Sequence, residues 1–267
     1  PMKQTKFLED MSAEELGQMD MKVPSGLQNL GNTCYLNSVV QMLHHISPLQ
    51  QAAQSFNKTS DPHAKLASSL GQVFRQISIA GGSAYSPIAF LADLYTVFPD
   101  FSETKEDSMV PMQQDAEECF SRLLNVLESQ LPGSKIRQLF GLELSVEYRC
   151  GEADEVTTVH ETSFKLPCHI RKDVGFLMSG VSQSLEETIT KNSAVLGREA
   201  VFVKRQRISR LPKYLTVQLV RFFWKPGVGN KPGNRAKIVK PIQFPEVLDL
   251  YDLCDGSLQT KLKAVRA

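Results

Sequence analysis

The sequence predicts an α+β fold in which helices come first and mostly antiparallel strands follow. Up to about residue 131, apolar residues recur every three or four positions, which is the period of an amphipathic helix. Further along, apolar and polar residues alternate, as they do in half-buried strands. The chain has 267 residues, of which 42% are hydrophobic, so it can bury a sizeable core as one large domain or two small ones.

Helices are predicted over residues 34–45, 62–77, 87–98 and 115–131. Asn32 or Thr33 can cap the first of them. Asp115 can cap the last, and Glu118 three residues later makes most of a capping box. The apolar positions of the third helix are Ile88, Leu91, Leu94, Tyr95 and Phe98, and those of the last are Ala116, Cys119, Phe120, Leu123, Leu124, Leu127 and Leu131. Residues 1–25 are interpreted as a leader with a short helical pattern over residues 13–19.

Strands are predicted over residues 142–148, 161–166, 200–208, 214–223 and 238–244, with a helical piece over residues 183–190. Residues 225–237 are rich in Gly, Pro, Lys and Asn and are predicted to form a loop. Helices followed by antiparallel strands argue for a helical lobe that faces a sheet lobe. A cleft between two such lobes is a natural place for a functional site.

Charge and cysteine content narrow the possible functions. The 30 basic and 29 acidic residues give a net charge of +1, so neither nucleic acid nor an anionic membrane is expected as a partner. No apolar run approaches the ~20 residues of a membrane helix. The five cysteines are an odd number and are not closely paired. We therefore expect no disulfide framework and a reducing compartment, which means the cytoplasm and possibly also the nucleus.

Cys34 is the first candidate for a chemical role. It lies where a loop becomes a helix, so free backbone N–H groups and the positive end of the helix dipole favour its thiolate. Gly31 allows a tight turn before the helix. Asn29 can direct its amide at an oxyanion formed beside the sulfur, together with the backbone N–H of Cys34. The alternative is that Cys34 is a small buried residue and that Asn29 and Asn32 are ordinary turn and cap residues.

The stretch Gly26–Ser38, with Asn-Thr-Cys-Tyr around Cys34, closely resembles the cysteine box of the ubiquitin-specific proteases. In that family, the position matching Asn29 supports the oxyanion hole. The resemblance implies a papain-like fold with a helical thumb and a β-rich palm and fingers. It also implies hydrolysis of the isopeptide bond after the C-terminal glycine of ubiquitin. On this basis residues 26–267 are a partial catalytic domain: 26–135 form the thumb, 136–267 form the fingers and part of the palm, and the C-terminal part of the palm is missing.

The chain also resembles a second sequence box of the family, at Gln113, Gln114 and Asp115 and the acidic pair that follows them. A carboxylate suits a guanidinium group and amides suit an extended backbone, and the ubiquitin tail is extended and carries arginines. The resemblance therefore implies a ubiquitin-tail site at these three residues, whereas the simpler alternative is that Asp115 only caps its helix. Residues 211–222 resemble a third box of the family, a strand that follows a Leu-Pro turn. We assign most of these residues to core packing.

Residues 7–11, 208–212, 222–224 and 251–254 are similar to the proteasome-associated member of the family. In that member, the loop corresponding to residues 225–237 blocks the tail groove until the enzyme docks. The resemblance implies ubiquitin, ubiquitinated proteins and the regulatory particle of the 26S proteasome as partners. In the strand region, Cys150 and Cys168 fall short of the four ligands of a structural zinc site, so no metal and no cofactor are expected.

A cysteine protease needs a histidine as its general base. In the family that histidine stands in a Gly-His-Tyr motif, and no segment of this chain resembles that motif. His44 and His45 lie about three turns along the helix from Cys34. We therefore expect the catalytic His and Asp to lie outside this sequence, and this chain alone to be inactive. The alternative function is a non-catalytic ubiquitin-binding or proteasome-interaction module. A different papain-like acyl transferase would not explain the second and third boxes.

Overall fold

The computed structural model describes residues 11–12, 14–15, 25–104, 108–227 and 233–264. The chain forms two compact units, Pro1–Lys135 and Ile136–Ala267. The prediction of a leader over residues 1–25, with a helical pattern over 13–19, falls largely outside the described residues.

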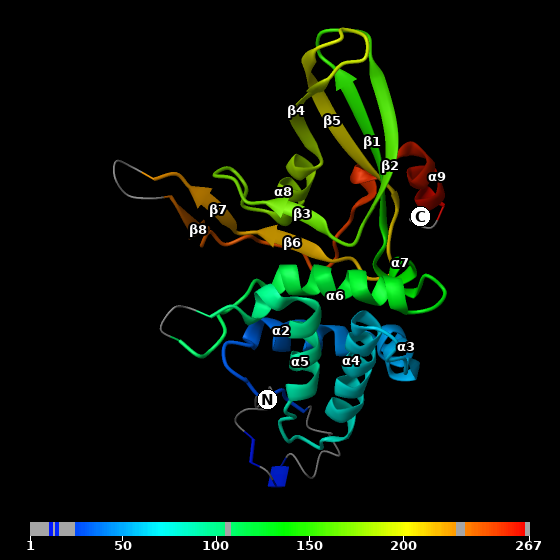
Figure 1. The fold of residues 1–267 in the computed structure, drawn as a ribbon. Coiled ribbons are helices and arrows are strands. Elements are labelled where there is room, and N and C mark those ends of the chain that lie inside the picture. Colours follow the sequence, from blue (N-terminus) through cyan, green and yellow to red (C-terminus); the bar gives the residue numbers. More distant parts are fainter. Residues whose placement is uncertain (1–10, 13, 16–24, 105–107, 228–232, 265–267) are drawn as a thin grey trace, which may run out of the picture. The chain divides into compact units, whose positions relative to one another are not determined.

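The first unit is helical. Its described elements are α2 (Cys34–His44), α3 (Ser47–Ser55), α4 (Pro62–Ile79), α5 (Ile88–Val97), the 3₁₀ helix η2 (Pro99–Ser102) and α6 (Ala116–Gln130). Helix α4 packs against α3 and α5, and α6 packs against α2 and α4 (Figure 1). The largest fully buried side chains of this unit are Phe74, Phe90, Phe101, Leu36, Leu43, Leu49, Leu66, Leu70, Leu94 and Leu123. These helices therefore enclose a single apolar core.

The predicted helices of this unit are present, with three differences. Thr33 is the N-cap residue of α2, but its side chain makes no capping bond. Helix α3 was not predicted, because only Leu49 and Ala53 of its nine residues are buried and the apolar signal is weak. In α5, Ile88 was predicted to be a core position but is 63% exposed, whereas Phe90 is buried. Ile88 and Ala89 begin that helix and are both exposed, so the buried stripe of α5 starts at Phe90.

The second unit combines three small sheets with short helices. Its elements are α7 (Lys135–Phe140, which begins at the boundary between the units), β1 (Leu142–Cys150), β2 (Val156–Ser163), β3 (Leu166–His169), α8 (Leu177–Ser184), β4 (Glu186–Asn192), β5 (Glu199–Arg210), β6 (Val217–Val220), β7 (Phe222–Lys225), β8 (Asn234–Lys237), η3 (Tyr251–Leu253) and α9 (Gly256–Lys263). The largest sheet is antiparallel with the strand order β2-β1-β5-β4, whereas β3 and β6 pair in parallel and β7 and β8 form a hairpin (Figure 1). The mixed α+β class predicted from the sequence is therefore present.

Strand β1 shows the predicted alternation, with every second residue buried over its first half. Its buried side chains join a core to which α8, β5 and the segment around η3 also contribute. The members of this core are Leu142, Leu144, Val146, Leu166, Cys168, Val181, Leu185, Ile208, Leu250, Leu253 and Cys254. The alternation thus identifies the buried face of the sheet.

Two predictions around β3 and β4 were wrong. The strand predicted over 161–166 is interrupted, because the Ser163 hydroxyl bonds both the backbone N–H and the carbonyl of Lys165 and makes a local turn. The helix predicted over 183–190 is instead the end of α8 followed by β4. Strand β4 pairs with β5 along its whole length, and this long-range pairing overrides the local helical pattern.

The last predicted strands also differ. Residues 214–223 split into β6 and β7, and residues 238–244 form no strand. The guanidinium of Arg221 donates to the carbonyls of Ile238 and Lys240. These carbonyls are therefore bonded by a side chain and not by the backbone N–H groups of a neighbouring strand. The predicted loop over 225–237 contains β8, and residues 228–232 lie outside the described residues. The Leu-Pro box was expected in the core, yet its apolar residues are only partly buried, and Leu219 is 37% exposed.

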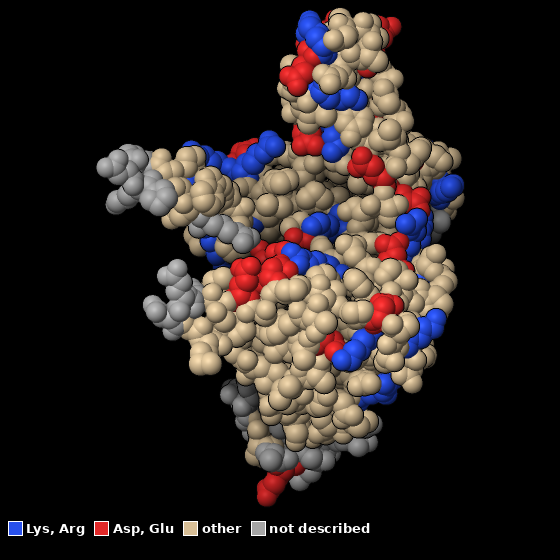
Figure 2. All heavy atoms as spheres, in the orientation of Figure 1, with Lys and Arg blue, Asp and Glu red and all other residues tan. Residues whose placement is uncertain are grey.

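Charges of both signs are interspersed on the face of the molecule that Figure 2 shows. At the turns of the four-stranded sheet they form specific pairs, such as Arg198 with Glu152 at 2.8 Å. Among the described helices, none has the length and the apolar character that crossing a membrane requires.

The carboxylate of Glu155 holds the turn between β4 and β5. It accepts bonds from the Ser193 hydroxyl and from the backbone N–H groups of Ala194 and Val195. The Ser193 bond is the largest cause that lowers the pKa of Glu155 from its ordinary value of 4.5. Burial opposes it, and the two backbone bonds and the charge of Lys191 add to the lowering. Because the pKa is lower in the folded state, the carboxylate stabilises this turn above pH 4.5, and the stabilisation is lost as the pH falls through the lowered pKa.

An NMR titration of the Glu155 carboxyl should therefore give a midpoint below 4.5, and the amide signals of Ala194 and Val195 should move with it. In Ser193→Ala the midpoint should move back toward 4.5, because the largest cause of the shift is gone. A wild-type midpoint at or above 4.5 would contradict this assignment.

Candidate active site

The loop before α2 is built around the side chain of Asn29. Its Oδ1 accepts from the backbone N–H groups of Gly31 and Thr33, both at 3.1 Å, and from the Thr33 hydroxyl at 3.3 Å. The Thr33 hydroxyl accepts in turn from the N–H of Leu30 at 3.0 Å. Since the amide oxygen faces this set of donors, the amide nitrogen Nδ2 is the end of the group that remains to donate outward.

The backbone of this loop depends on two residues in the left-handed region, Gly31 with φ 96° and Asn32 with φ 53°. A Cβ on Gly31 would approach Cγ1 of Val110 to 2.9 Å, so only glycine fits there. Asn32 Nδ2 donates to the carbonyl of Pro111 at 3.0 Å. The loop before α2 is therefore fixed to the segment that leads into α6.

Cys34 is the first residue of α2, and it is exposed, whereas the other four cysteines are buried. As the first helical residue, it has a backbone N–H with no acceptor inside the helix. Burial raises the pKa of the Cys119 thiol to about 12 and also raises the pKa values of Cys168 and Cys254. Of the five thiols, Cys34 is thus the one that a large substrate can reach.

The residues of the second box lie beside this cysteine. Gln113 Nε2 donates to the sulfur of Cys34 at 3.1 Å, and Gln114 Nε2 donates to the carbonyl of Asp100 at 3.4 Å. Asp115 Oδ1 accepts from the N–H of Glu117 at 2.9 Å, so Asp115 caps α6. The structure therefore brings together Cys34, Gln113 and the Asn29 loop. The contact of Gln113 with the sulfur was not anticipated, because Gln113 was assigned from the sequence only to the ubiquitin tail.

Arg122 supports this arrangement from α6. Its guanidinium pairs with Asp100 at 2.8 Å and with Glu118 at 2.5 Å, and it lies over the rings of Phe98 and Phe101. The pairing with Asp100 is the largest cause that raises the pKa of Arg122, and Arg122 in turn lowers the pKa of Asp100. Because Asp100 also receives the Gln114 amide, this network fixes the start of α6.

The three histidines of the first unit each have a partner other than Cys34. The His44 ring contacts Ser78 and Gln50, and burial lowers its pKa. His44 ends α2 and His45 caps it, about 15 Å along the helix axis from Cys34, and Nδ1 of His45 contacts the carbonyl of Gln41. His63 lies beside Asp61 at the start of α4. No described histidine of this unit is therefore placed as the general base of Cys34.

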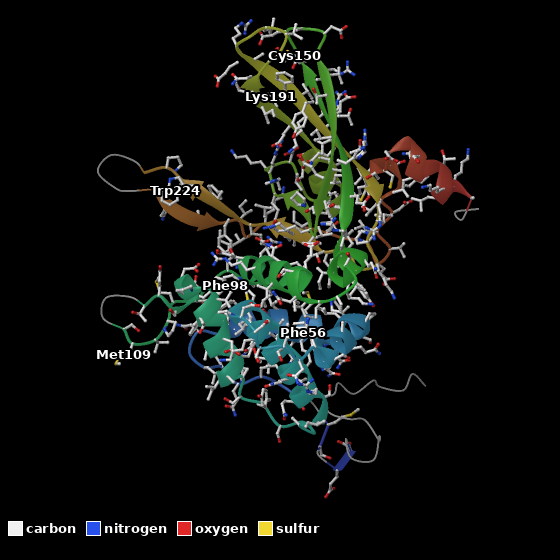
Figure 3. The ribbon with its side chains drawn as sticks, turned by 45° about the vertical axis from the view of Figure 1, so that its right-hand side comes forward. Phe56, Phe98, Met109, Cys150, Lys191 and Trp224 are labelled. Carbon is white, nitrogen blue, oxygen red and sulfur yellow. The ribbon has the colours of Figure 1, made fainter. Side chains whose placement is uncertain are left out.

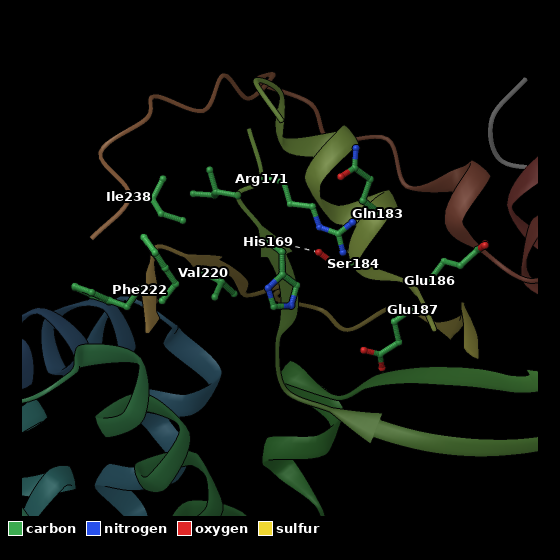
Figure 4. A pocket seen from close by; sticks show the side chains of 11 residues that line it. His169, Arg171, Gln183, Ser184, Glu186, Glu187, Val220, Phe222 and Ile238 are labelled. Atoms are coloured by element: carbon green, nitrogen blue, oxygen red, sulfur yellow. Dashed lines mark hydrogen bonds between the residues drawn. The ribbon is translucent and has the colours of Figure 1, made fainter. Parts of the chain in front are cut away.

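The second unit contains a pocket of about 320 Å³ between β3, α8, β6 and β7 (Figure 4). His169 and Ser184 line it, but the bond between them joins the backbone N–H of His169 to Ser184 Oγ at 2.9 Å and does not involve the imidazole. The Ser184 hydroxyl itself donates to the carbonyl of Gly180. This pair is consequently not arranged as a nucleophile and its base.

Cys150 lies near the far end of the four-stranded sheet (Figure 3). Cys150 packs with Ala200 and Phe202, and the ammonium of Lys191 lies 4.8 Å from the centre of the Phe202 ring. In the described residues, no group of three or more His, Cys, Asp or Glu side chains could hold a metal ion. The absence of a metal from the whole protein stays a prediction.

Comparison with known proteins gives the family. Residues 25–266 match the family described as ubiquitin carboxyl-terminal hydrolase. The chain is 38% identical over 258 residues to ubiquitin carboxyl-terminal hydrolase 6 of Schizosaccharomyces pombe, covering 96% of this chain and 53% of that protein. It is 38% identical over 267 residues to ubiquitin carboxyl-terminal hydrolase 14 of Caenorhabditis elegans, covering 97% of this chain and 52% of that protein. For ubiquitin carboxyl-terminal hydrolase 6 of Arabidopsis thaliana the identity is 36% over 279 residues, covering 100% of this chain and 56% of that protein.

The chain thus belongs to the ubiquitin carboxyl-terminal hydrolase family of cysteine-type deubiquitinases. The resemblance found in the cysteine box is confirmed at this level. The chain spans about half the length of the curated relatives that it matches.

Proposed function

We propose that the protein hydrolyses the isopeptide bond after the C-terminal glycine of ubiquitin, with Cys34 as its nucleophile. One observation carries the proposal: an exposed cysteine begins a helix directly after a loop that holds the Asn29 amide by its oxygen. The helix start favours the thiolate, and the anchored amide is a preorganised donor.

The chemistry follows from these groups. The Cys34 thiolate attacks the carbonyl carbon of the ubiquitin glycine, and the C=O electron pair moves onto oxygen. Asn29 Nδ2 and the backbone N–H of Cys34 stabilise that oxyanion. When the tetrahedral intermediate collapses, the C–N bond breaks, the amine leaves with a proton, and a thioester to Cys34 remains. Water then hydrolyses the thioester and restores the thiol.

The proton steps need a base that the described histidines of the first unit do not supply. We propose that the base and its orienting partner lie outside this sequence, and that this chain by itself carries the nucleophile but does not turn over substrate. Gln113, Gln114 and Asp115 are proposed to contact the extended ubiquitin tail, with Asp115 also capping α6. We propose association with the proteasome from the resemblance to the proteasome-associated member, and a cytoplasmic location from the odd number and wide spacing of the cysteines.

A ubiquitin derivative with an electrophile in place of its C-terminal carboxylate tests the proposal. The chain should form one covalent adduct at Cys34, and Cys34→Ala should form none. Ubiquitin without the electrophile is the control for mass and binding. If wild type forms no adduct while iodoacetamide still alkylates Cys34, the thiol is reactive but the ubiquitin assignment is wrong.

The second candidate is a non-catalytic ubiquitin-binding module, which is favoured because no described histidine of the first unit is placed as the base of Cys34. Reversible binding of ubiquitin that is equal in wild type and Cys34→Ala, without an adduct to the electrophilic derivative, would support the module over the enzyme.

A further inference from the structure

The contact between Gln113 and Cys34 assigns a role that the tail-binding prediction did not include. Gln113 Nε2 lies 3.1 Å from Cys34 Sγ, which is short for a hydrogen bond to sulfur. We propose that Gln113 is a catalytic residue whose amide donates to the Cys34 sulfur and favours the thiolate before substrate arrives. This inference rests on the proposed role of Cys34 as nucleophile, and it assigns the group that prepares it.

The contact is made between two fixed segments rather than between two free surface side chains. Asn32 Nδ2 bonds the carbonyl of Pro111, so the loop before α2 is tied to the segment that carries Gln113. The N–H of Met112, in the same peptide unit, donates to the carbonyl of Glu103 at 2.8 Å. Because both groups of this peptide unit are bonded, the backbone directly before Gln113 is fixed beside the loop that carries Cys34.

The side chains of the two residues that follow Gln113 make other bonds. Gln114 donates to the carbonyl of Asp100, and Asp115 caps α6. Gln113 is therefore the residue of the second box whose amide is directed at the reacting atom. Its side chain is exposed, so replacing it removes no core contact.

The bond distinguishes the two protonation states of the sulfur. An amide N–H donates strongly to an anion but only weakly to a neutral thiol, which is a poor acceptor. Stabilising the anion more than the thiol favours loss of the proton to solvent or to the base. This effect adds to that of the α2 N-terminus. Solvent reduces the strength of such a bond, so we expect about a tenfold change in the thiol–thiolate equilibrium.

The same group can serve the substrate later in the reaction. When the C–S bond forms, the sulfur loses its negative charge and attracts the Gln113 N–H less. The amide keeps a second N–H and its carbonyl oxygen throughout. Contact with the ubiquitin tail and preparation of the sulfur are therefore compatible roles.

The test is the pH profile of Cys34 alkylation by iodoacetamide in this chain, from about pH 5 to pH 10, a range that includes the ordinary thiol titration. Wild type is compared with Gln113→Leu, which removes the donor, with Gln113→Glu, which replaces it by an anion, and with Gln72→Leu, which makes the same change at an exposed glutamine of α4. Mass spectrometry counts only the addition that is absent from Cys34→Ala.

For Gln113→Leu, the midpoint of the profile should rise by about one pH unit. The rate at neutral pH should fall about threefold, while the alkaline plateau should rise about threefold, because a more basic thiolate is a stronger nucleophile. Gln113→Glu should raise the midpoint further, and Gln72→Leu should leave the profile as in wild type. The two curves of wild type and Gln113→Leu should therefore cross.

A purely structural role would change the rate in the same direction at every pH. Such a parallel change, or a Gln113→Leu profile that matches wild type, would overturn the inference. The assay needs no ubiquitin. Crossing curves without a ubiquitin adduct would contradict the proposed substrate alone, and an adduct without crossing curves would contradict the role of Gln113 alone.

Discussion

Replacing Asn29 with either alanine or aspartate should lower the kcat for ubiquitin cleavage about 100- to 1,000-fold and leave KM nearly unchanged. The reason is that the Asn29 amide nitrogen stabilises charge that exists only in the transition state. Binding of the ubiquitin tail does not depend on that charge. The measurement is steady-state cleavage of ubiquitin carrying a fluorogenic amide at its C-terminus, in the form of the protein that turns over this substrate.

The two substitutions separate catalysis from loop structure. In Asn29→Asp, a carboxylate can still accept from Gly31 and Thr33, so the loop before α2 keeps its internal bonds. In Asn29→Ala those bonds are lost, and stability should fall by about 1–2 kcal/mol. We therefore expect equal losses of activity but unequal losses of stability, the latter measured by chemical denaturation.

The outcome for aspartate is decisive. If Asn29→Asp keeps wild-type kcat while Asn29→Ala loses it, Asn29 acts only by holding the loop. The donor assignment would then be wrong, although Cys34 could remain the nucleophile.

The parts of the fold that sequence predicts well are those governed by local periodicity. Helices α2, α4 and α6 have strong apolar stripes, and the structure buries those stripes. Strand β1 alternates clearly and pairs on both sides, with β2 and with β5. In these elements local pattern and tertiary packing agree.

The predictions failed where partners distant in sequence decide the structure. Residues 183–190 look helical locally, but β4 is formed by pairing with β5 and by cross-strand ion pairs such as Lys204 with Glu187. Residues 238–244 alternate like a strand, yet Arg221 bonds their first carbonyls. Neither interaction can be inferred from the segment alone.

The candidate site shows the same division. Cys34 and Asn29 belong to one contiguous stretch, so their proximity follows from the sequence. The bond from Gln113 to Cys34 joins residues 79 positions apart, and no spacing rule could supply it. The one signal in the sequence was that Gln113, an amide residue of the second box, stands two residues before Asp115, the N-cap of α6. Structure was needed to show which atom that amide contacts.

The second large effect is expected at Gly71, in the middle of α4. A Cβ there would lie 2.1 Å from the carbonyl oxygen of Ala53 and 3.2 Å from the nitrogen of Gln54, both backbone atoms of α3. Neither atom can move without displacing that helix. The neighbouring small residues Ala64 and Ala67 are also buried, which is consistent with a close approach of α3 and α4.

Helix propensity and packing make opposite predictions for Gly71→Ala. Propensity alone favours alanine by about 1 kcal/mol in a helix interior. Overpacking against a fixed backbone should outweigh this gain, and we expect a net loss of about 2–3 kcal/mol in the free energy of unfolding. The measurement is urea denaturation of the chain followed by circular dichroism.

Gly256→Ala is the matched control, because Gly256 begins α9 and a Cβ there would have no atom within 4 Å. Its effect should stay within about 0.5 kcal/mol of wild type. If Gly71→Ala were as stable as wild type or more stable, the gain in helix propensity would outweigh the cost of overpacking. There would then be room for a methyl group between α3 and α4, which would contradict the close approach of α4 to the backbone of α3 at Gly71.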